Sequence, residues 1–400
     1  MNQNPTAAEL RNKLVDEMIM TTVTLTPDVE HALRTVSREA YLPGVDLKDA
    51  YADQAVTIKE NPNGPLALSC ASVPSVVAMM LVQLDVQPGA NILEIGAGTG
   101  YNAALLAELT GGLGSVTSID IDPDVTLHAR TMLNRTGYQR VTVIERDGLV
   151  GAPENAPYDR MLAAVGLWDV PAAWWDQLRD GGRLVLPLRW RGQTRSVALT
   201  RRGDTLVSDG MALCGFVPII GQDGEKTAAL NADDTIRVHY DEDQAVDVDA
   251  LAASLRDAPG IETLSEQRVG GEEPFDGVWL RATAGDDRVC RLEVTPDAVD
   301  QDLILRPAIP VRSPVLVDGD SLAYLIVRRE GTDLQRPFRL GAAAYGPQAE
   351  ALAQDLITHI EAWGSARTSV PRLTITPAKT DAAVTGHVIN KPESRMTLTY

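Results

Sequence analysis

The chain has 400 residues, of which 44% are hydrophobic and 23% charged, as in folded globular proteins and unlike disordered ones. Its net charge of −19 argues against a nucleic-acid partner, because most of such a surface would repel phosphates. No apolar run approaches the roughly 20 residues that span a bilayer, and the N-terminal segment has no signal-peptide pattern. We therefore expect a cytoplasmic, monomeric protein of two domains that does not bind membranes.

Three helices are predicted before residue 85. Residues 6–20 repeat apolar side chains at helical spacing, and Thr6 with Glu9 matches a capping box. Residues 28–43 repeat that spacing. Residues 73–84 are apolar and carry a proline in the first turn, where proline is best tolerated.

The pattern changes between residues 91 and 188, where short aliphatic runs alternate with helix-like segments. The runs are 91–96, 115–121, 141–147, 159–165 and 182–188. This alternation is typical of a parallel sheet covered by helices on both faces. Residues 195–216 have a hairpin pattern, so the last strands of this sheet are expected to be antiparallel.

The polar stretch 222–235 predicts a domain boundary, with a first domain at 1–225 and a second at 226–400. In the second domain, two predicted helices (246–258 and 346–364) accompany several strand-like runs, which indicates an α+β domain. The strand-like runs are 235–240, 277–283, 289–294, 322–329, 338–345, 372–376 and 396–400.

The stretch LEIGAGTGY, residues 93–101, ends an apolar run with an acid and three glycines spaced two residues apart. A nucleoside triphosphate loop needs a lysine after its last glycine, where this chain has Tyr101. A dinucleotide remains possible, because Gly98, Gly100 and the later Asp120 satisfy its fingerprint.

Acidic side chains at the ends of predicted strands favour a cationic ligand. Glu94, at the mouth of the loop, would repel a pyrophosphate but could help to hold the ammonium of S-adenosylmethionine. Asp147 could accept a hydrogen bond from an adenine amino group, although it and Asp120 each also fit a cap or turn. The set predicts S-adenosylmethionine as cofactor. The predicted cofactor-binding residues are Glu94, Gly96, Gly98, Gly100, Asp120, Ile121, Asp147 and Gly148.

Several segments together resemble one family. The segments, in order, are AYADQAVTI (50–58), SCASVPSVVAMML (69–81), LEIGAGTGYNAALLAEL (93–109), SIDIDP (118–123), RDG (146–148), APYDRM (156–161), GGRLVLPL (181–188) and GFVPIIG (215–221). This series resembles protein-L-isoaspartate O-methyltransferase over about residues 28–221. The resemblance implies a Rossmann-like, class I S-adenosylmethionine-dependent methyltransferase fold with a doubly wound, mostly parallel sheet.

The resemblance also implies a catalytic position at Ser72, where the hydroxyl would lie against the carboxylate being methylated. The alternative is that Ser72 caps the helix that starts at Pro74. This chain has Cys70 and Val73 where the family has threonine and glutamine, so the implied substrate site, formed by Ser69, Cys70 and Val73, is similar but altered.

The 226–400 extension resembles long actinobacterial members of the family encoded with ribosomally made, modified peptides of lanthipeptide, lasso and graspetide pathways. That resemblance implies that the extension recognises a cyclised precursor peptide. One aspartate of the peptide would be methylated, and the ester would close to an aspartimide that hydrolyses to isoaspartate. The alternatives are a repair enzyme for isoaspartate in damaged proteins, an inactive peptide-binding module and an NAD-dependent dehydrogenase.

Other residues with reactive side chains are expected to be structural. The three cysteines are isolated and the five histidines lack metal-ligand spacing, so no metal site is expected. Trp174 and Trp175 are expected to pack a helix on the sheet, with the substrate entrance as the alternative. Five arginines form either the outer face of a solvated hairpin or a docking strip for an acidic peptide. These arginines are Arg189, Arg191, Arg195, Arg201 and Arg202.

Overall fold

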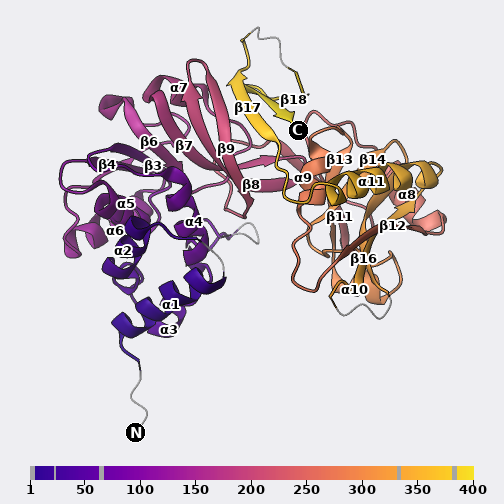
Figure 1. The fold of residues 1–400 in the computed structure, drawn as a ribbon, viewed down its shortest axis with the longest axis horizontal. Helices are drawn as coiled ribbons and strands as arrows, with labels where there is room; N and C mark the ends of the chain where they lie inside the picture. Colours follow the sequence, from indigo (N-terminus) through magenta and orange to yellow (C-terminus); the bar gives the residue numbers. More distant parts are fainter. Residues whose placement is uncertain (1–4, 22–23, 63–66, 331–334, 381–384) are drawn as a thin grey trace.

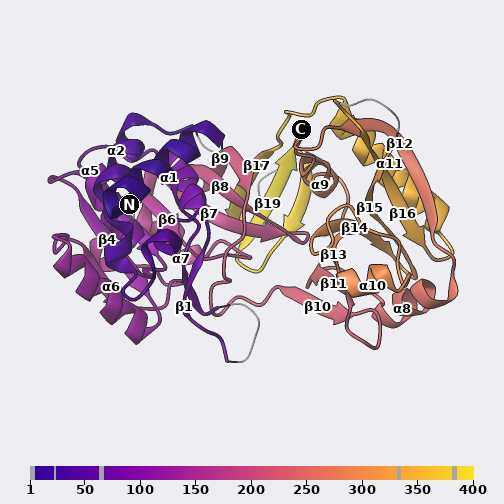
Figure 2. The same cartoon turned by 90° about the horizontal axis from the view of Figure 1, so that it is seen from below.

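The computed structural model describes residues 5–21, 24–62, 67–330, 335–380 and 385–400. It has two parts side by side, each built on a large sheet (Figures 1 and 2). The ten-stranded sheet has the order β18-β19-β17-β9-β8-β7-β6-β3-β4-β5, and the seven-stranded sheet has the order β10-β11-β13-β14-β15-β16-β12. Within the described ranges, no helix combines the length and apolarity needed to cross a bilayer.

Short helices form the N-terminal region, as the apolar spacing predicts. The capping box is confirmed, because the Thr6 amide donates to Glu9 Oε2 at 2.7 Å and the Glu9 amide donates to Thr6 Oγ1 at 3.3 Å. The helix predicted over 28–43 ends early, because the backbone becomes extended where Val36 is buried. The elements are α1 (Ala7–Thr21), α2 (Pro27–Thr35), η1 (Arg38–Tyr41), α3 (Leu47–Ala50), β1 (Val56–Lys59) and β2 (Ser69–Ala71).

The predicted parallel sheet is confirmed. Its strands are β3 (Asn91–Ile95), β4 (Ser115–Asp120), β5 (Thr142–Glu145), β6 (Tyr158–Ala163) and β7 (Leu178–Trp190). The accompanying helices are α4 (Pro74–Leu84), α5 (Tyr101–Thr110), α6 (Pro123–Arg135), η2 (Pro153–Asn155) and α7 (Ala172–Gln177). Successive side chains on β3 enter different cores: Ile92 packs with the N-terminal helices and Leu93 with Trp174 of α7. The chain reverses its strand order beside β3, which creates a topological switch point.

The C-terminal strands join the first sheet. As predicted, β8 (Gln193–Arg202) and β9 (Thr205–Leu213) run antiparallel after β7. The next neighbours of β9 are β17 (Arg372–Pro377), β19 (Ser394–Thr399) and β18 (His387–Asn390), and Figure 2 shows β17 and β19 between the two parts. A single domain boundary at residue 225 therefore does not describe the path of the chain. Leu373 and Ile375 of β17 are fully buried in the core of the first part. The strand β17 therefore covers both the edge of β9 and apolar side chains of this core.

The second sheet is antiparallel and carries α11 across β12, β15 and β16. Its strands are β10 (Glu225–Ala229), β11 (Ile236–Asp241), β12 (Ile261–Val269), β13 (Val289–Val294), β14 (Ser313–Asp318), β15 (Ser321–Arg329) and β16 (Phe338–Tyr345). Its helices are α8 (Val248–Asp257), α9 (Gly277–Thr283), α10 (Pro296–Asp300) and α11 (Ala349–Gly364). The strand predicted at 277–283 is wrong, because this short apolar run forms α9 and buries side chains on several sides.

The tip of the β7–β8 hairpin inserts into the second part. Arg191 adopts the left-handed φ of +47°, and its guanidinium is 2% exposed and binds both oxygens of Asp243 at 2.6 and 2.8 Å. The Arg191 amide donates to Asp241 Oδ2 at 2.9 Å, and Trp279 Nε1 donates to the Arg191 carbonyl at 3.1 Å. This buried, charge-assisted contact connects the two sheets.

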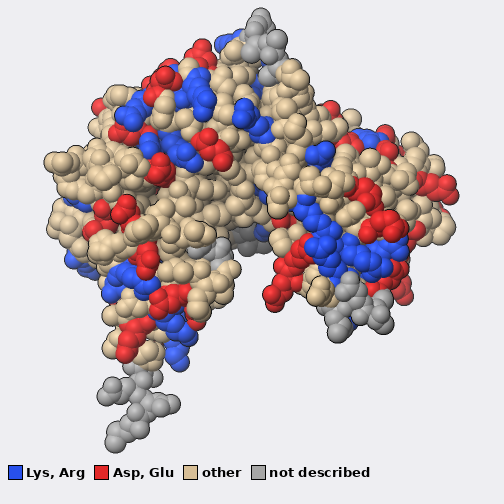
Figure 3. Space-filling model, viewed as in Figure 1, with Lys and Arg blue, Asp and Glu red and all other residues tan. Residues whose placement is uncertain are grey.

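The arginine strip therefore lies largely in the junction between the two parts. Arg195 is 4% exposed and binds Asp276 at 2.8 Å, while Arg189 binds Glu225 at 3.1 Å. For Arg191 and Arg195, both sequence interpretations are wrong, since neither side chain faces solvent or a docking partner. On the face shown in Figure 3, acidic and basic side chains lie close together, with the largest basic group on the second part.

Candidate active site

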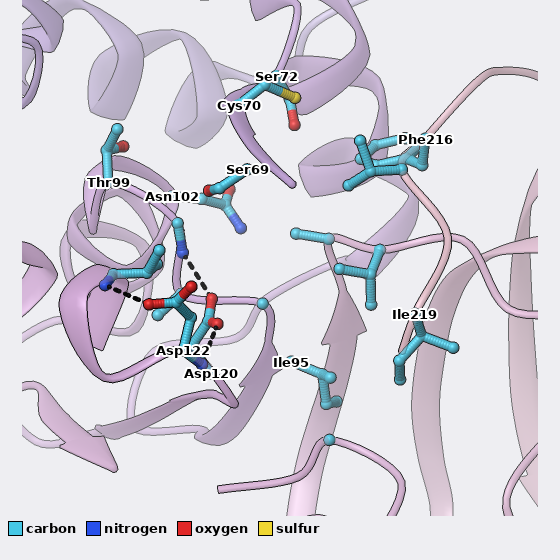
Figure 4. A pocket seen from close by; sticks show the side chains of 18 of the residues that line it. Ser69, Cys70, Ser72, Ile95, Thr99, Asn102, Asp120, Asp122, Phe216 and Ile219 are labelled. Carbon is cyan, nitrogen blue, oxygen red and sulfur yellow. Dashed lines mark hydrogen bonds between the residues drawn. The ribbon is translucent and has the colours of Figure 1, made fainter. Parts of the chain in front are cut away.

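A cavity opens where the strands β3 and β4 end, at the switch point of the sheet (Figure 4). It contains about 1200 Å³ of empty space, part of it open to solvent, and it lies at the carboxyl ends of the strands, where open α/β sheets bind their ligands. The predicted residues that line it are Ser69, Cys70, Ser72, Gly96, Gly98, Asp120, Ile121, Asp147 and Gly148. Glu94, Gly100 and Val73 are not among the lining residues.

The glycine loop lines the cavity with backbone. Gly96, Gly98 and Gly100 have φ angles of +93°, +51° and +87°, in the left-handed region that favours glycine. A Cβ atom at Gly98 would have only the Cys70 carbonyl oxygen within 4 Å, at 3.9 Å, so this backbone is open to the cavity. At Gly100, a Cβ atom would instead meet the Ala129 carbonyl oxygen at 3.1 Å. The cofactor-binding prediction for Gly100 is therefore corrected: this glycine allows α5 to start against α6.

Glu94 lies beneath the loop rather than at its rim. Its carboxylate is fully buried and accepts hydrogen bonds from Asn102 Nδ2 at 2.7 Å and Ser118 Oγ at 2.5 Å. Burial raises the pKa of Glu94 to about 7, although these hydrogen bonds oppose the shift. The prediction that Glu94 lies at the mouth of the loop, where it would help to hold a ligand ammonium, is therefore corrected, because β3 carries the side chain into the protein interior. Asn102 lines the cavity in its place.

Asp120 connects the end of β4 to the glycine loop. One carboxylate oxygen accepts from the Gly98 amide at 3.2 Å, and the other accepts from the Asp122 amide at 3.1 Å. Burial raises the pKa of Asp120. Asp122 caps α6 and binds Lys59 Nζ at 2.5 Å, and the Lys59 ammonium lowers the pKa of Asp122. Asp120 and Asp122 therefore give this end of the cavity an acidic wall (Figure 4).

The loop after β5 supplies another part of the wall. Asp147 Oδ1 accepts from the Leu149 amide at 2.9 Å, which is a turn contact. Gly148 approaches β3 so closely that a Cβ atom would lie 2.6 Å from Ile95 Cγ2. Trp174 Nε1 donates to the Gly148 carbonyl at 3.0 Å. The packing role predicted for Trp174 is confirmed, since its ring is 1% exposed in the core beneath this loop.

Ser72 is not the cap of α4. The capping position is Val73, whose side chain forms no capping bond, and the Ser75 amide donates instead to Asp53 Oδ1 at 2.9 Å. The Ser72 hydroxyl has no hydrogen-bond partner in the described part of the chain and lines the cavity. Figure 4 shows Ser72 and Cys70 at the end of the cavity away from Asp120. Val73 is corrected from a substrate contact to a helix-capping position outside the cavity.

Arg38, which the sequence analysis did not single out, fixes the backbone that carries Ser72. Its side chain is 1% exposed, with Nη2 donating to the Ser72 carbonyl at 2.9 Å and Nε donating to the Ala50 carbonyl at 3.0 Å. The guanidinium lies 5.2 Å from the centre of the Tyr101 ring, and burial lowers its pKa. Burial also raises the pKa of the neighbouring Cys70 thiol. The sequence alone does not indicate this role, because a single arginine after a predicted helix matches no functional motif.

The segment 216–220 forms the wall opposite the glycine loop. Phe216 and Ile219 contribute apolar side chains (Figure 4). Backbone hydrogen bonds hold the segment to Gly166, whose amide donates to the Val217 carbonyl at 2.7 Å and whose carbonyl accepts from the Ile219 amide at 2.8 Å. Among the described residues, no three or more His, Cys, Asp or Glu side chains lie together in a way that could hold a metal ion.

The switch-point cavity, the glycine loop after β3 and the acids after β4 and β5 define the class I S-adenosylmethionine-dependent methyltransferase fold. Residues 9–224 match the family described as protein-L-isoaspartate(D-aspartate) O-methyltransferase. The chain therefore belongs to this family, and it is a carboxyl O-methyltransferase that uses S-adenosylmethionine.

Individual relatives agree with this assignment. The protein-L-isoaspartate O-methyltransferase of Methanocella arvoryzae is 38% identical over 191 residues, which are 48% of this chain and 97% of the relative. That of Hyperthermus butylicus is 35% identical over 226 residues, 54% of this chain and 90% of the relative. A solved structure of a protein-L-isoaspartate O-methyltransferase matches at 19% identity with a TM-score of 0.51, and the match covers 97% of this chain and 99% of that one. This last likeness extends over both parts of the chain and concerns the fold.

Proposed function

We propose that the cavity binds S-adenosylmethionine at its acidic end and a peptide carboxylate at its Ser72 end. The observation that carries this proposal is the Ser72 hydroxyl, which lines the cavity without a hydrogen-bond partner in the described ranges. Bound S-adenosylmethionine supplies an activated methyl group on a positively charged sulfur. The carboxylate of an aspartyl or isoaspartyl residue is the acceptor.

The residues of the cavity fit this cofactor. A cationic ligand suits a wall that carries Asp120 and Asp122, and the open backbone at Gly98 allows close approach. In this assignment Gly96, Gly98, Asp120 and Ile121 hold the methionine and ribose parts, while Asp147 and Gly148 hold the adenine. Glu94 does not contact the cofactor in this assignment; it accepts a hydrogen bond from Asn102, which lines the cavity, and so orients that side chain.

The protein needs to orient the acceptor rather than activate it. A carboxyl with an unperturbed pKa of about 4 is already ionised at neutral pH, so no general base is required. Ser72 donates a hydrogen bond that aims the carboxylate, and Arg38 keeps the Ser72 backbone in place. Methyl transfer cancels a positive and a negative charge, so apolar walls such as Phe216, which exclude water, favour the step.

As substrate we propose an aspartate in a cyclised, ribosomally made precursor peptide. One feature supports it: Cys70 lines the site where the family has threonine. After methylation, a backbone amide nitrogen of the peptide attacks the ester carbonyl, the amide proton leaves with methoxide as methanol, and an aspartimide forms. The second candidate is isoaspartate in damaged proteins, which is favoured by the names of the curated relatives.

The test compares two acceptors with methyl-labelled S-adenosylmethionine. One is the precursor peptide encoded nearest the gene, after cyclisation, and the other is an unstructured isoaspartyl peptide. We expect label on the cyclised peptide, followed by methanol release. Efficient turnover of the isoaspartyl peptide alone would establish the repair candidate. No transfer to either acceptor by protein that binds the cofactor would refute the proposal.

A further inference from the structure

A second hollow, which we call the junction groove, lies across the segment 217–220 from the cavity. It contains about 1030 Å³ of empty space, part of it open to solvent. Trp168, Arg189 and residues 222–225 form its other side. The residues that border both the groove and the cavity are Leu68, Val217, Pro218, Ile219 and Ile220. A ligand that passes over these residues can therefore occupy both spaces.

Glu225 gives the junction groove a polar end built by both sheets. One oxygen, Oε2, accepts from Arg189 Nη1 of β7 at 3.1 Å and from Arg291 Nη2 of β13 at 3.2 Å. The side chain is only 10% exposed, and its other oxygen, Oε1, is buried without a hydrogen-bond partner among the described residues. A buried acceptor without a donor is unfavourable, so a ligand that supplies the donor gains free energy.

The surroundings select the kind of donor. Arg189 and Arg291 already pair with Glu225, and Arg291 also lies 3.7 Å from Glu293, so the charges of this cluster are balanced and a third cation would add an unpaired charge. A neutral N–H fits better. The groove wall also carries Leu68, which is 44% exposed, and Ile220, which is 58% exposed. Apolar walls with one free carboxylate oxygen, whose charge is already balanced, match an extended peptide, whose backbone amides and side chains alternate.

We propose that the junction groove binds the peptide segment next to the methyl-accepting residue, with a backbone N–H of that segment donating to Glu225 Oε1. The inference rests on the proposed function, because it takes a peptide as the substrate. The second sheet then contributes directly to substrate affinity through Glu225 of β10 and Arg291 of β13.

The test uses Glu225→Gln, with Glu272→Gln as a matched control on an exposed residue of the same part. In the variant, the glutamine oxygen keeps the two arginines, so an NH₂ group faces the groove where the acceptor was. The probes are acetyl-isoaspartyl-glycinamide and a twelve-residue isoaspartyl peptide. Their binding is measured calorimetrically with S-adenosylhomocysteine present, and their methylation is measured with S-adenosylmethionine.

We expect the long peptide to bind the wild type about tenfold more tightly than the short one. Glu225→Gln should remove most of this advantage and leave the affinity for the short peptide unchanged, while Glu272→Gln should behave as wild type. Equal affinity of both peptides for the wild type, with both methylated, would overturn the groove assignment and leave the proposed function intact. If Glu225→Gln lowered the affinity for both peptides equally, the groove assignment would also be overturned.

A second variant covers the case in which Glu225→Gln is less stable. Ile220→Asp changes an exposed wall residue and should weaken the long peptide more than the short one. Unchanged long-peptide affinity in this variant would contradict the groove assignment. If neither peptide nor the cyclised precursor is methylated, the proposed function fails, and the groove inference fails with it.

Discussion

The buried carboxyl of Glu94 makes stability depend on pH in a way that Glu94→Gln should remove. Burial raises the pKa of Glu94 from 4.5 to about 7 in the folded protein. Glutamine has the same shape: its oxygen can accept from Asn102, and its NH₂ group can donate to the Ser118 hydroxyl. The variant therefore keeps both contacts and loses only the titration.

The expected change in stability follows from the pKa values of Glu94 in the unfolded and the folded chain. Below pH 4.5 the carboxyl is protonated in both the folded and the unfolded chain, so Glu94 stabilises the fold fully. As pH rises from 4.5 to 7, the unfolded chain releases its proton while the folded chain keeps it, and stability falls. The difference between the two pKa values corresponds to about 3 kcal/mol, most of which is lost between pH 5 and pH 8.

The assay is urea unfolding of wild type and Glu94→Gln at pH 5 and pH 8 without cofactor. We expect the free energy of unfolding of the variant to gain about 2–3 kcal/mol relative to wild type over this interval. Identical pH dependence of the two proteins would show that Glu94 does not titrate in this range and would refute the burial argument.

Three further predictions concern the site and the junction. Ser72→Ala should lower turnover about 10- to 100-fold with nearly unchanged cofactor affinity, because one orienting hydrogen bond is lost; a collapse of calorimetric cofactor binding would show that Ser72 is structural. Arg191→Met should destabilise the protein by about 1–3 kcal/mol, because Asp241 and Asp243 lose the buried guanidinium while Asp241 keeps hydrogen bonds from the Arg191 amide and Trp168 Nε1, and it should separate the calorimetric transitions of the two parts. The exposed-pair control Arg256→Met should leave them unchanged, and a single wild-type transition in Arg191→Met would contradict the role of the hairpin tip. Deleting 372–400 removes five buried apolar side chains (Leu373, Ile375, Ile389, Met396 and Leu398), worth about 7–15 kcal/mol at about 1.5–3 kcal/mol each. This loss is as large as the total free energy of unfolding of a typical domain, so circular dichroism should show that the truncated chain is unfolded. A folded product that binds the cofactor would refute the claim that the C-terminal strands share a core with the first sheet.

Local patterns in the sequence predicted much of the catalytic part. The alternation of aliphatic runs and helical segments requires only neighbouring residues, and it predicted the five parallel strands. The glycines of the loop were equally visible, because a left-handed φ is a property of single positions. The Ser72 segment could be identified only through a family resemblance, since one serine before a helix has several possible roles.

Contacts between distant segments were not predictable in this way. The side chain of Glu94 faces the interior because β4 and α5 close over it, and Arg38 acquires its role only where the Ser72 segment approaches. The last strands have the same alternating pattern as those of the second sheet, yet they join the first sheet through β17, which pairs with the edge of β9.

The local order of polar and apolar residues thus specified which segments are helices and strands in 91–213, along with the loop that the cofactor requires. The tertiary structure assigned partners: which sheet receives the C-terminal strands, which carboxylates stay in the interior, and which arginines join the two parts. The reason is physical. Periodicity is set by backbone geometry over a few residues, whereas burial and pairing depend on which distant surfaces meet.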